Sequence, residues 1–264
     1  MFQITPLVRN LLIINVVIFL LSIALPFANI NDTFSLHSIY SDHFAIYQLI
    51  THMFLHGSFG HLFSNMFTLF MFGTMLEMAW GPRKFLIFYM VCGIGGGVLY
   101  GLVNTYEIYE LKNAYEIYLA SPDPDNLAHF LRTQAPSIYK ENLNIIELFA
   151  KNPHDIGIQH SIADQLQLIF NSQKDGLMLG ASGAVFGLLL AFGVTFPNLE
   201  LMIFPLFIPV KAKYLVFIYG AIELFTGLYK PADDGVAHFA HLGGMLFGFI
   251  VLAIWKKNDK NKDY

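Results

Sequence analysis

The amino-acid sequence predicts an all-α membrane protein: a bundle of six transmembrane helices with an extracytoplasmic helical insert between the third and fourth spans. Two observations carry this prediction. Hydrophobic residues make up 55% of the 264 positions, charged residues make up only 13%, and the mean hydropathy is +0.53. An ordinary soluble domain carries about 25% charged residues. The apolar residues also gather in largely uncharged runs of roughly 20, the length that a helix needs to cross a bilayer.

Six apolar runs are predicted to be the spans. The first is ended by Pro26, and the third follows a turn at Gly81 and Pro82. A further apolar run at 201–210 is short and broken by two prolines, so it is predicted to lie at the membrane interface. The predicted spans are residues 11–25, 61–80, 85–103, 177–196, 214–229 and 236–255.

The composition divides the chain into four parts. Residues 1–103 hold spans one to three, and residues 177–255 hold spans four to six. Between them, residues 104–176 carry most of the acidic side chains and four prolines. Apolar residues in this insert are spaced as in short amphipathic helices, which indicates either a small helical subdomain or a partly ordered loop. Residues 256–264 form a basic tail that is expected to anchor the topology and attract anionic lipid.

The basic residues of the short loops predict the orientation in the membrane, because lysine and arginine concentrate on the cytoplasmic side. If the N-terminus is cytoplasmic, that side holds nine of them: Arg9, Arg83, Lys84, Lys211, Lys213, Lys256, Lys257, Lys260 and Lys262. The short loops opposite then hold only Lys230. The sequence therefore predicts a multi-pass integral membrane protein with both termini in the cytoplasm, and a bacterial cell membrane is the expected location.

Four polar residues are predicted to meet at one depth. In this topology spans two, four and six enter the bilayer from the outer face. Span two brings His61 and Asn65, which share a helix face. Ser182 and His241 each lie about five residues inside their spans, roughly 8 Å below the surface. Polar groups in a membrane usually face a bundle interior or water, so their convergence indicates a site.

Glycines predict which spans touch. Gly183 and Gly187 form a small-residue stripe on span four, and Gly244 and Gly248 form another on span six. Such stripes let helix backbones approach closely. His241 precedes Gly244 by three residues and therefore lies on the contacting face. This packing is expected to bring His241 within hydrogen-bond reach of the serine beside the other stripe.

A serine next to a histidine is the pattern of a nucleophile and its general base. We expect Ser182 to be the nucleophile and His241 the base. The Ser182 backbone N–H, His61 and Asn65 are expected to donate hydrogen bonds to an oxyanion. No carboxylate is expected near His241, because Asp233 and Asp234 fall in the preceding loop, so a dyad is predicted.

The same residues resemble the rhomboid family of intramembrane serine proteases. The resemblance covers nearly the whole membrane portion, and several motifs in order make it specific. The matching segments are Thr51–Met66, then Glu77 and Gly81, then Gly180-Ala181-Ser182-Gly183, then Ala240-His241-Leu242-Gly243-Gly244 with Gly248.

The resemblance implies the six-helix fold, Ser182 as nucleophile, His241 as base, and His61 and Asn65 at the oxyanion. It also implies single-span or polytopic membrane-protein substrates, cut near the outer membrane surface. The long insert departs from the family pattern. So does Phe186, which stands where a tyrosine often stacks on the histidine; a phenyl ring can still stack but cannot hydrogen-bond.

Other interpretations of these residues stay open. Ser182 taken alone would usually be a packing serine. A catalytically inactive rhomboid-like protein that binds membrane proteins is the alternative function, and an ion transporter built on Glu223 is a third. Glu223 itself is expected to be a satisfied structural glutamate. His238, three residues before His241, could compete for the role of base.

The remaining expectations concern metals and partners. His52 and His56 could form a metal pair with His61 or His238, but no cysteine or carboxylate completes such a site. We therefore expect no metal and no cofactor, and we expect these two histidines to fix the loop before span two. Glu77 is predicted to cap backbone groups. Membrane lipid is an expected partner, and nucleic acid is not.

Overall fold

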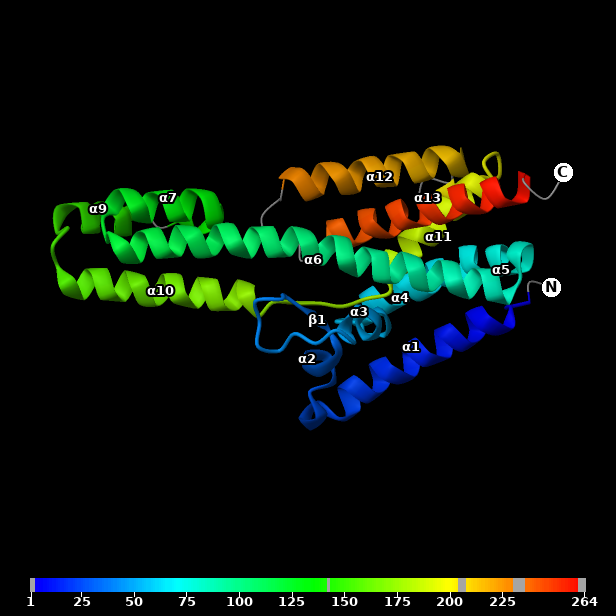
Figure 1. Cartoon of the computed structure of the whole chain (residues 1–264), viewed down its shortest axis with the longest axis horizontal. Coiled ribbons are helices and arrows are strands. Elements are labelled where there is room, and N and C mark those ends of the chain that lie inside the picture. Colours follow the sequence, from blue (N-terminus) through cyan, green and yellow to red (C-terminus); the bar gives the residue numbers. More distant parts are fainter. Residues whose placement is uncertain (1–2, 142, 204–207, 230–235, 261–264) are drawn as a thin grey trace.

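The computed structural model describes residues 3–260 apart from 142, 204–207 and 230–235. Figure 1 shows a bundle of helices from which one long helix, α6 (Pro82–Ala120), extends far beyond the others. Helices from the middle of the sequence surround this extension, and both ends of the described part of the chain lie at the opposite end of the bundle. The described structure is therefore all-helical apart from two short strand pairs.

The elements follow one another along the chain with few long irregular segments. The bundle comprises α1 (Pro6–Ala24), α4 (Phe59–Thr68), the π-helical turn η3 (Leu69–Gly73), α5 (Thr74–Trp80), α6, α11 (Ser182–Thr195), α12 (Ala212–Tyr229) and α13 (His238–Lys260). Short helices join α1 to α4: η1 (Pro26–Ala28), α2 (Ile30–Phe34), α3 (Gln48–Thr51) and η2 (His52–Phe54). The remaining helices are α7 (Pro124–Gln134), α8 (Pro136–Glu141), α9 (Leu143–Lys151) and α10 (Ile156–Lys174).

Two antiparallel strand pairs complete the described fold. Strand β1 (Leu36–His37) pairs with β2 (Leu177–Met178), and β3 (Glu200–Ile203) pairs with β4 (Ile208–Lys211). The second pair occupies the run predicted to lie at the membrane interface, of which residues 204–207 are outside the described part. The tail residues 261–264 and the loop residues Asp233 and Asp234 are outside it as well.

Four described helical segments are long and apolar enough to cross a membrane: residues 6–24, 59–80, 82–120 and 238–258. They coincide with the predicted first, second, third and sixth spans. Helix α11 is apolar but has only 14 residues, about 21 Å of helix. That is less than the roughly 30 Å of a bilayer's hydrocarbon core. The protein is therefore an all-helical membrane protein.

Helix α6 continues past the predicted boundary between the third span and the insert. We placed that boundary at residue 104 because acidic residues become frequent there, yet the helix continues without a break for 39 residues to Ala120. A change in polarity does not end a helix, and no glycine or proline occurs from Leu102 to Ser121. At 1.5 Å per residue the helix is about 58 Å long, nearly twice the hydrocarbon thickness.

The far half of α6 and the helices α7 to α10 enclose a hydrophobic core of their own. Eleven buried side chains form it: Ile108, Leu111, Ala114, Tyr118, Leu127, Phe130, Leu131, Ala135, Phe149, Ile162 and Leu166. Of the two forms expected for the insert, this is the helical subdomain. We call it the α7–α10 cluster. Hydrogen bonding of Ser41 to Asp175 (2.8 Å) joins its last helix to the connection that precedes α3.

Glycines bring α6, α11 and α13 into backbone contact. A methyl group at Gly244 would land on the backbone of Gly183, and one at Gly187 would meet Cys92 of α6. One at Gly96 would lie 2.6 Å from the carbonyl oxygen of Ala240. The two glycine stripes of the sequence thus lie against each other, and α6 is a third partner that the stripes alone did not indicate.

Glu77 fixes the start of α1, as predicted. Its carboxylate accepts hydrogen bonds from the Thr5 hydroxyl (2.5 Å) and from the backbone N–H groups of Leu7 (3.1 Å) and Val8 (2.9 Å). These are first-turn donors that have no partner within the helix. A buried glutamate of α5 therefore serves as the cap of α1.

Candidate functional site

Ser182 is the first residue of α11, which corrects its predicted place about five residues inside a helix starting at 177. Residues 177 and 178 instead form β2, paired with β1. The N–H of Gly180 then donates to the carbonyl oxygen of His52 at 2.9 Å. These contacts hold the segment extended, so the helix begins only at the serine.

Gly180 has a backbone conformation that other residues rarely adopt. Its φ of 133° lies in the region that favours glycine. A methyl group there would lie 2.7 Å from Cε1 and Nε2 of His61 and 3.7 Å from the Ser182 hydroxyl oxygen. Glycine at this position therefore lets the His61 ring lie close to the serine.

All four predicted site residues line one cavity of about 1030 Å³. Ser182 comes from α11, His61 and Asn65 from α4, and His241 from α13. Among the described residues, Ser182 and His241 line this cavity without a hydrogen bond between them. The volume lies at the upper end of the range for small-molecule sites, which is room for an extended peptide segment.

Part of the cavity wall was not predicted. Tyr100, Asn104 and Glu107 line it from α6, at the start of the extension beyond the bundle. Their spacing of three to four residues places them on one helix face. That periodicity was readable in the sequence, but it became a signal only once α6 was known to continue past residue 103.

Two kinds of hydrogen-bond donor at the cavity lack an acceptor. Asn65 is buried, and its Nδ2 has no partner among the described residues. The cap residue of α11, Ala181, supplies no side-chain acceptor, and the first N–H groups of a helix have none within it. Free donors at a helix N-terminus favour a negative charge there.

The His241 ring is held on one face by Phe186, one turn after Ser182 on α11. Their ring centroids are 4.1 Å apart and their planes differ by only 7°, so the rings are stacked. The expectation that a phenyl ring can stack here agrees with this geometry. His241 is buried, so the stacked ring also keeps water from that face.

Glu223 contradicts the expectation that no carboxylate lies near His241. Its Oε2 is 2.9 Å from Nδ1 of His241, within ion-pair distance, although the ring is not turned for a straight hydrogen bond. The same oxygen is 2.7 Å from Nδ1 of His238. Glu223 lies on α12, whereas His241 lies on α13. The contact could not be predicted, because the spacing of residues within one helix does not show which of its faces packs against a neighbouring helix.

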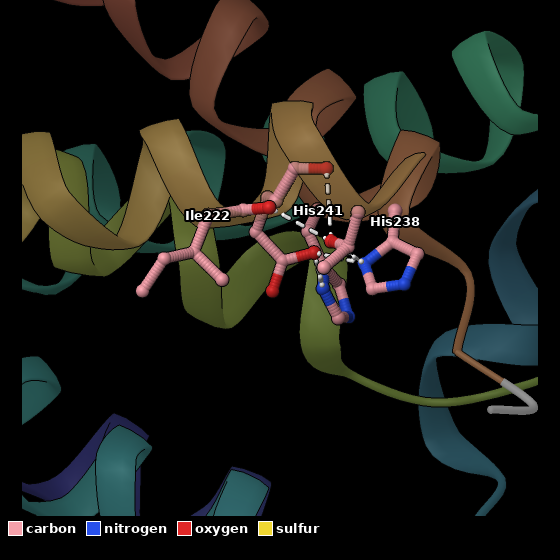
Figure 2. A network of polar contacts seen from close by, with 5 residues as sticks. Ile222, His238 and His241 are labelled. Carbon is pink, nitrogen blue, oxygen red and sulfur yellow. Dashed lines mark hydrogen bonds and ion pairs between the residues drawn. The ribbon is translucent and has the colours of Figure 1, made fainter. Parts of the chain in front are cut away.

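Figure 2 shows how this polar network joins α12 to α13. The Thr226 hydroxyl lies 2.8 Å from the carbonyl oxygen of Ile222 and 3.1 Å from Nδ1 of His238. Glu223 and Thr226 both come from α12, and both histidines come from the first turns of α13. The network is therefore a polar contact between two largely apolar helices.

The carboxylate and the two histidines are compact enough to hold a metal ion, because their ligand-type atoms lie within 4.8 Å of one another. Two ligands of a tetrahedral zinc ion, however, lie roughly 3.3 Å apart when each bond is about 2.0–2.1 Å. The separations of 2.7 and 2.9 Å found here are those of directly contacting groups. The geometry thus fits a hydrogen-bonded network better than a metal centre.

His52 and His56 lie in the connection between α1 and α4, outside the candidate spans. Nδ1 of His52 is 2.7 Å from the carbonyl oxygen of Gln48, so this ring does fix the loop, whereas neither ring nitrogen of His56 has a hydrogen-bond partner among the described residues. Burial lowers the pKa of His52 to about 4 and that of His56 to about 3, so both are neutral at pH 7. Among the described residues, neither His52 nor His56 belongs to a group of three side chains whose ligand atoms lie close enough together to hold a metal ion.

Fold and site together define an all-helical membrane protein with a serine and three histidines at an open cavity. The sequence pattern of the Rhomboid domain matches residues 43–109 and 157–258, which is more than half of the chain. The chain therefore belongs to the rhomboid family. Residues 110–156, which fall between the two matched parts, form the end of α6 and most of the α7–α10 cluster.

A curated relative is consistent with this membership. RHOMBOID-like protein 12, mitochondrial, from Arabidopsis thaliana is 26% identical over 213 residues. The match covers 80% of this chain and 47% of that protein. The chain thus spans about half the length of the curated relative it matches.

Proposed function

We propose that the protein is an intramembrane serine endopeptidase that cleaves transmembrane segments by a Ser182–His241 pair. The observation that carries this proposal is the convergence at one cavity of a serine at a helix N-terminus, a stacked histidine and an unpartnered asparagine amide. A structural serine would need none of these neighbours. Family membership supports the same reaction.

In the proposed reaction the Ser182 hydroxyl oxygen adds to the carbonyl carbon of the scissile peptide, and Nε2 of His241 takes the hydroxyl proton. The C–N bond then breaks as this proton passes to the leaving amine. Water next attacks the acyl-enzyme and gives a proton to His241, and Ser182 leaves reprotonated. The missing Ser182–His241 hydrogen bond does not oppose this, because such bonds are often poorly aligned before substrate binds.

The donors at the cavity are proposed to hold the oxyanion formed in both addition steps. The Ser182 N–H, the Asn65 amide and the His61 ring approach the cavity from two helices. They are already fixed in place by α11, α4 and Gly180, so they need little reorganisation when the charge develops. The positive end of the α11 dipole, at Ser182, also stabilises the negative charge of the oxyanion.

For the membrane we propose six crossings, formed by α1, α4 with α5, α6, α11, α12 and α13. Both ends of the described chain lie at one end of the bundle and the α7–α10 cluster at the other, which supports termini on one side of the membrane and the insert on the opposite side. That the side of the termini is the cytoplasm stays a prediction from the basic residues of the short loops. Substrates are proposed to be single-span or polytopic membrane proteins, cut near the outer surface. A bacterial cell membrane stays a prediction; the Arabidopsis relative carries the word mitochondrial in its name.

The test is to label the purified protein with a fluorophosphonate probe, map the modified residue, and measure cleavage of a transmembrane substrate. We expect labelling at Ser182, and we expect Ser182→Ala to lower turnover at least about a thousandfold. Ser64→Ala is the matched control, because Ser64 lines the same cavity but donates its hydroxyl to the His61 carbonyl oxygen (3.1 Å).

Full cleavage by folded Ser182→Ala would refute the proposal. Absence of both labelling and cleavage in the folded wild-type protein would favour the alternative function, a rhomboid-like protein that binds membrane proteins without cutting them.

A further inference from the structure

We propose that Glu223 is a positioning residue that holds His241 in the tautomer and orientation needed to act as the base. This inference rests on the proposed function and deepens it, because it turns the predicted pair into a relay of Ser182, His241 and Glu223. Three points carry it: the short distance between Glu223 and His241, the tautomer that an adjacent carboxylate favours, and the contact with His238 that holds the carboxylate in place.

The distance is the 2.9 Å between Oε2 of Glu223 and Nδ1 of His241. Both side chains are about one-tenth exposed, so little water competes with the contact. Nδ1 of His241 has no other polar partner among the described residues, since its one polar contact is with this oxygen. The carboxylate is thus the only polar group in the described part that contacts Nδ1 of His241.

The proton count assigns the tautomer. An ionised carboxylate can only accept hydrogen bonds. A bare Nδ1 would bring its lone pair close to that negatively charged oxygen, 2.9 Å away, so the tautomer with the proton on Nδ1 is favoured. A neutral imidazole has one N–H, and Nε2 is therefore left bare. Nε2 is the nitrogen that the proposed reaction needs to take the proton of the serine hydroxyl.

The same oxygen also acts after the proton has moved. His241 then carries a positive charge 2.9 Å from a carboxylate in a poorly hydrated site, where opposite charges attract far more strongly than in water. The attraction exists only while the ring is charged, so it favours the charged intermediate over the resting state. This is the part of the effect that should appear in kcat.

His238 keeps the carboxylate in place. Its Nδ1 lies 2.7 Å from Oε2 of Glu223 and 3.1 Å from the Thr226 hydroxyl. The hydroxyl proton of Thr226 has its own acceptor in the Ile222 carbonyl, at 2.8 Å, so the Thr226 oxygen can accept from His238. His238 therefore donates to α12 and fixes the oxygen that faces His241 (Figure 2).

The experiment compares Glu223→Gln with wild type by kcat, KM and the rate of fluorophosphonate labelling of Ser182. The amide keeps the volume but loses the charge. We expect kcat and the labelling rate to fall together, by roughly 10²- to 10³-fold, with KM within about twofold. Glu223→Asp keeps the charge on a shorter side chain and should recover part of the loss.

Glu77→Gln is the matched control. It removes the charge of another buried glutamate of the bundle, one that caps α1 and has no contact with the cavity. It should lower thermal stability and leave kcat of the folded fraction unchanged. If Glu223→Gln behaves like Glu77→Gln, Glu223 is structural and the inference is overturned, while Ser182→Ala still decides the proposed function separately.

A second measurement does not depend on the Glu223 variants. Nitrogen NMR of wild-type protein labelled in histidine, with His241→Gln to assign the signal, reports which ring nitrogen carries the proton. We expect a protonated Nδ1 and a bare Nε2 at His241 at neutral pH. A bare Nδ1 would overturn the inference whatever the kinetic result.

Discussion

The two sides of α13 are built in different ways. Toward α11 and α6 the helix backbones themselves come into contact at Gly244, Gly183 and Gly96, and the stacking of Phe186 on His241 is a side-chain contact beside them. Toward α12 the contact is made by side chains, with Glu223 on the two histidines and the end of Met245 against Gly220. At these glycines the first side cannot adjust without moving backbone, whereas the side chains on the second side can change conformation. The proposed nucleophile, Ser182, and the proposed base, His241, thus lie on helices whose backbones are in contact, which we call the stiff side of α13. Glu223 approaches from α12, which we call the soft side.

The largest effect should come from adding one methyl group to the stiff side. In Gly244→Ala the new Cβ would fall on the Gly183 carbonyl group. Backbone cannot move aside as a side chain can, so we expect a loss of more than about 3 kcal/mol of unfolding free energy, or no folded protein. Thermal unfolding in detergent and cleavage activity measure the result.

Gly101→Ala is the control for that substitution, because a Cβ there meets nothing within 4 Å. It should be neutral or stabilise α6 by up to about 1 kcal/mol. A Gly244→Ala protein as stable and as active as Gly101→Ala would show that α11 and α13 are not held by backbone contact.

An effect of intermediate size on the unfolding free energy should come from lowering the pH. It acts through His52, in the loop that holds the segment before Ser182. The pKa of His52 is lowered to about 4 in the folded protein, against about 6.5 in an unfolded chain. Above pH 6.5 both states are neutral, so the residue adds no pH dependence. Below pH 6.5 the unfolded chain binds a proton that the folded protein does not, and stability falls by about 1.4 kcal/mol per pH unit down to about pH 4.

The measurement is the unfolding free energy of wild type and His52→Gln at pH 7 and pH 5. Wild type should lose about 2 kcal/mol more than the variant over this interval. The variant will be less stable at both values, so the comparison uses the slopes and not the absolute stabilities. Parallel slopes would mean that His52 takes up its proton without unfolding of the loop.

The smallest effect should come from the soft side of α13. In Gly220→Ala the new Cβ would lie 3.1 Å from the terminal methyl of Met245, which is the far end of a flexible side chain. The methyl can swing away, and alanine favours the helix, so we expect a change within about 1 kcal/mol. A loss as large as that of Gly244→Ala would remove the distinction between the two sides.

The sequence was sufficient to predict four residues that line the cavity, but not its α6 wall or the contacts that hold the four residues in place. His61, Asn65, Ser182 and His241 could be found because each lies at a readable place in an apolar run. Glu223 could not be assigned, since its role depends on the rotation of α12 about its own axis, which no spacing within α12 records.

The errors in helix boundaries have a related cause. Composition marked residue 104 as the end of the third span, but helix length depends on the breakers that follow, and none comes before Pro122. Hydrophobicity likewise marked Leu177 as the start of the fourth span. The segment is held extended instead by β1 and by the His52 carbonyl, which are more than 120 residues away in the chain.

The unbroken length of α6 has a mechanical consequence. The helix is held in the bundle at Gly96, lines the cavity at Asn104 and carries the α7–α10 cluster as far as Ala120. Taken as a stiff lever pivoting at Gly96, it has arms of about 12 Å to the cavity wall and about 36 Å to its tip. A tilt of about 5° would displace the tip by roughly 3 Å and the wall by only about 1 Å. Motions of the cluster therefore reach the cavity reduced about threefold, which lets a large, exposed helical cluster move while the wall beside Ser182 stays nearly still.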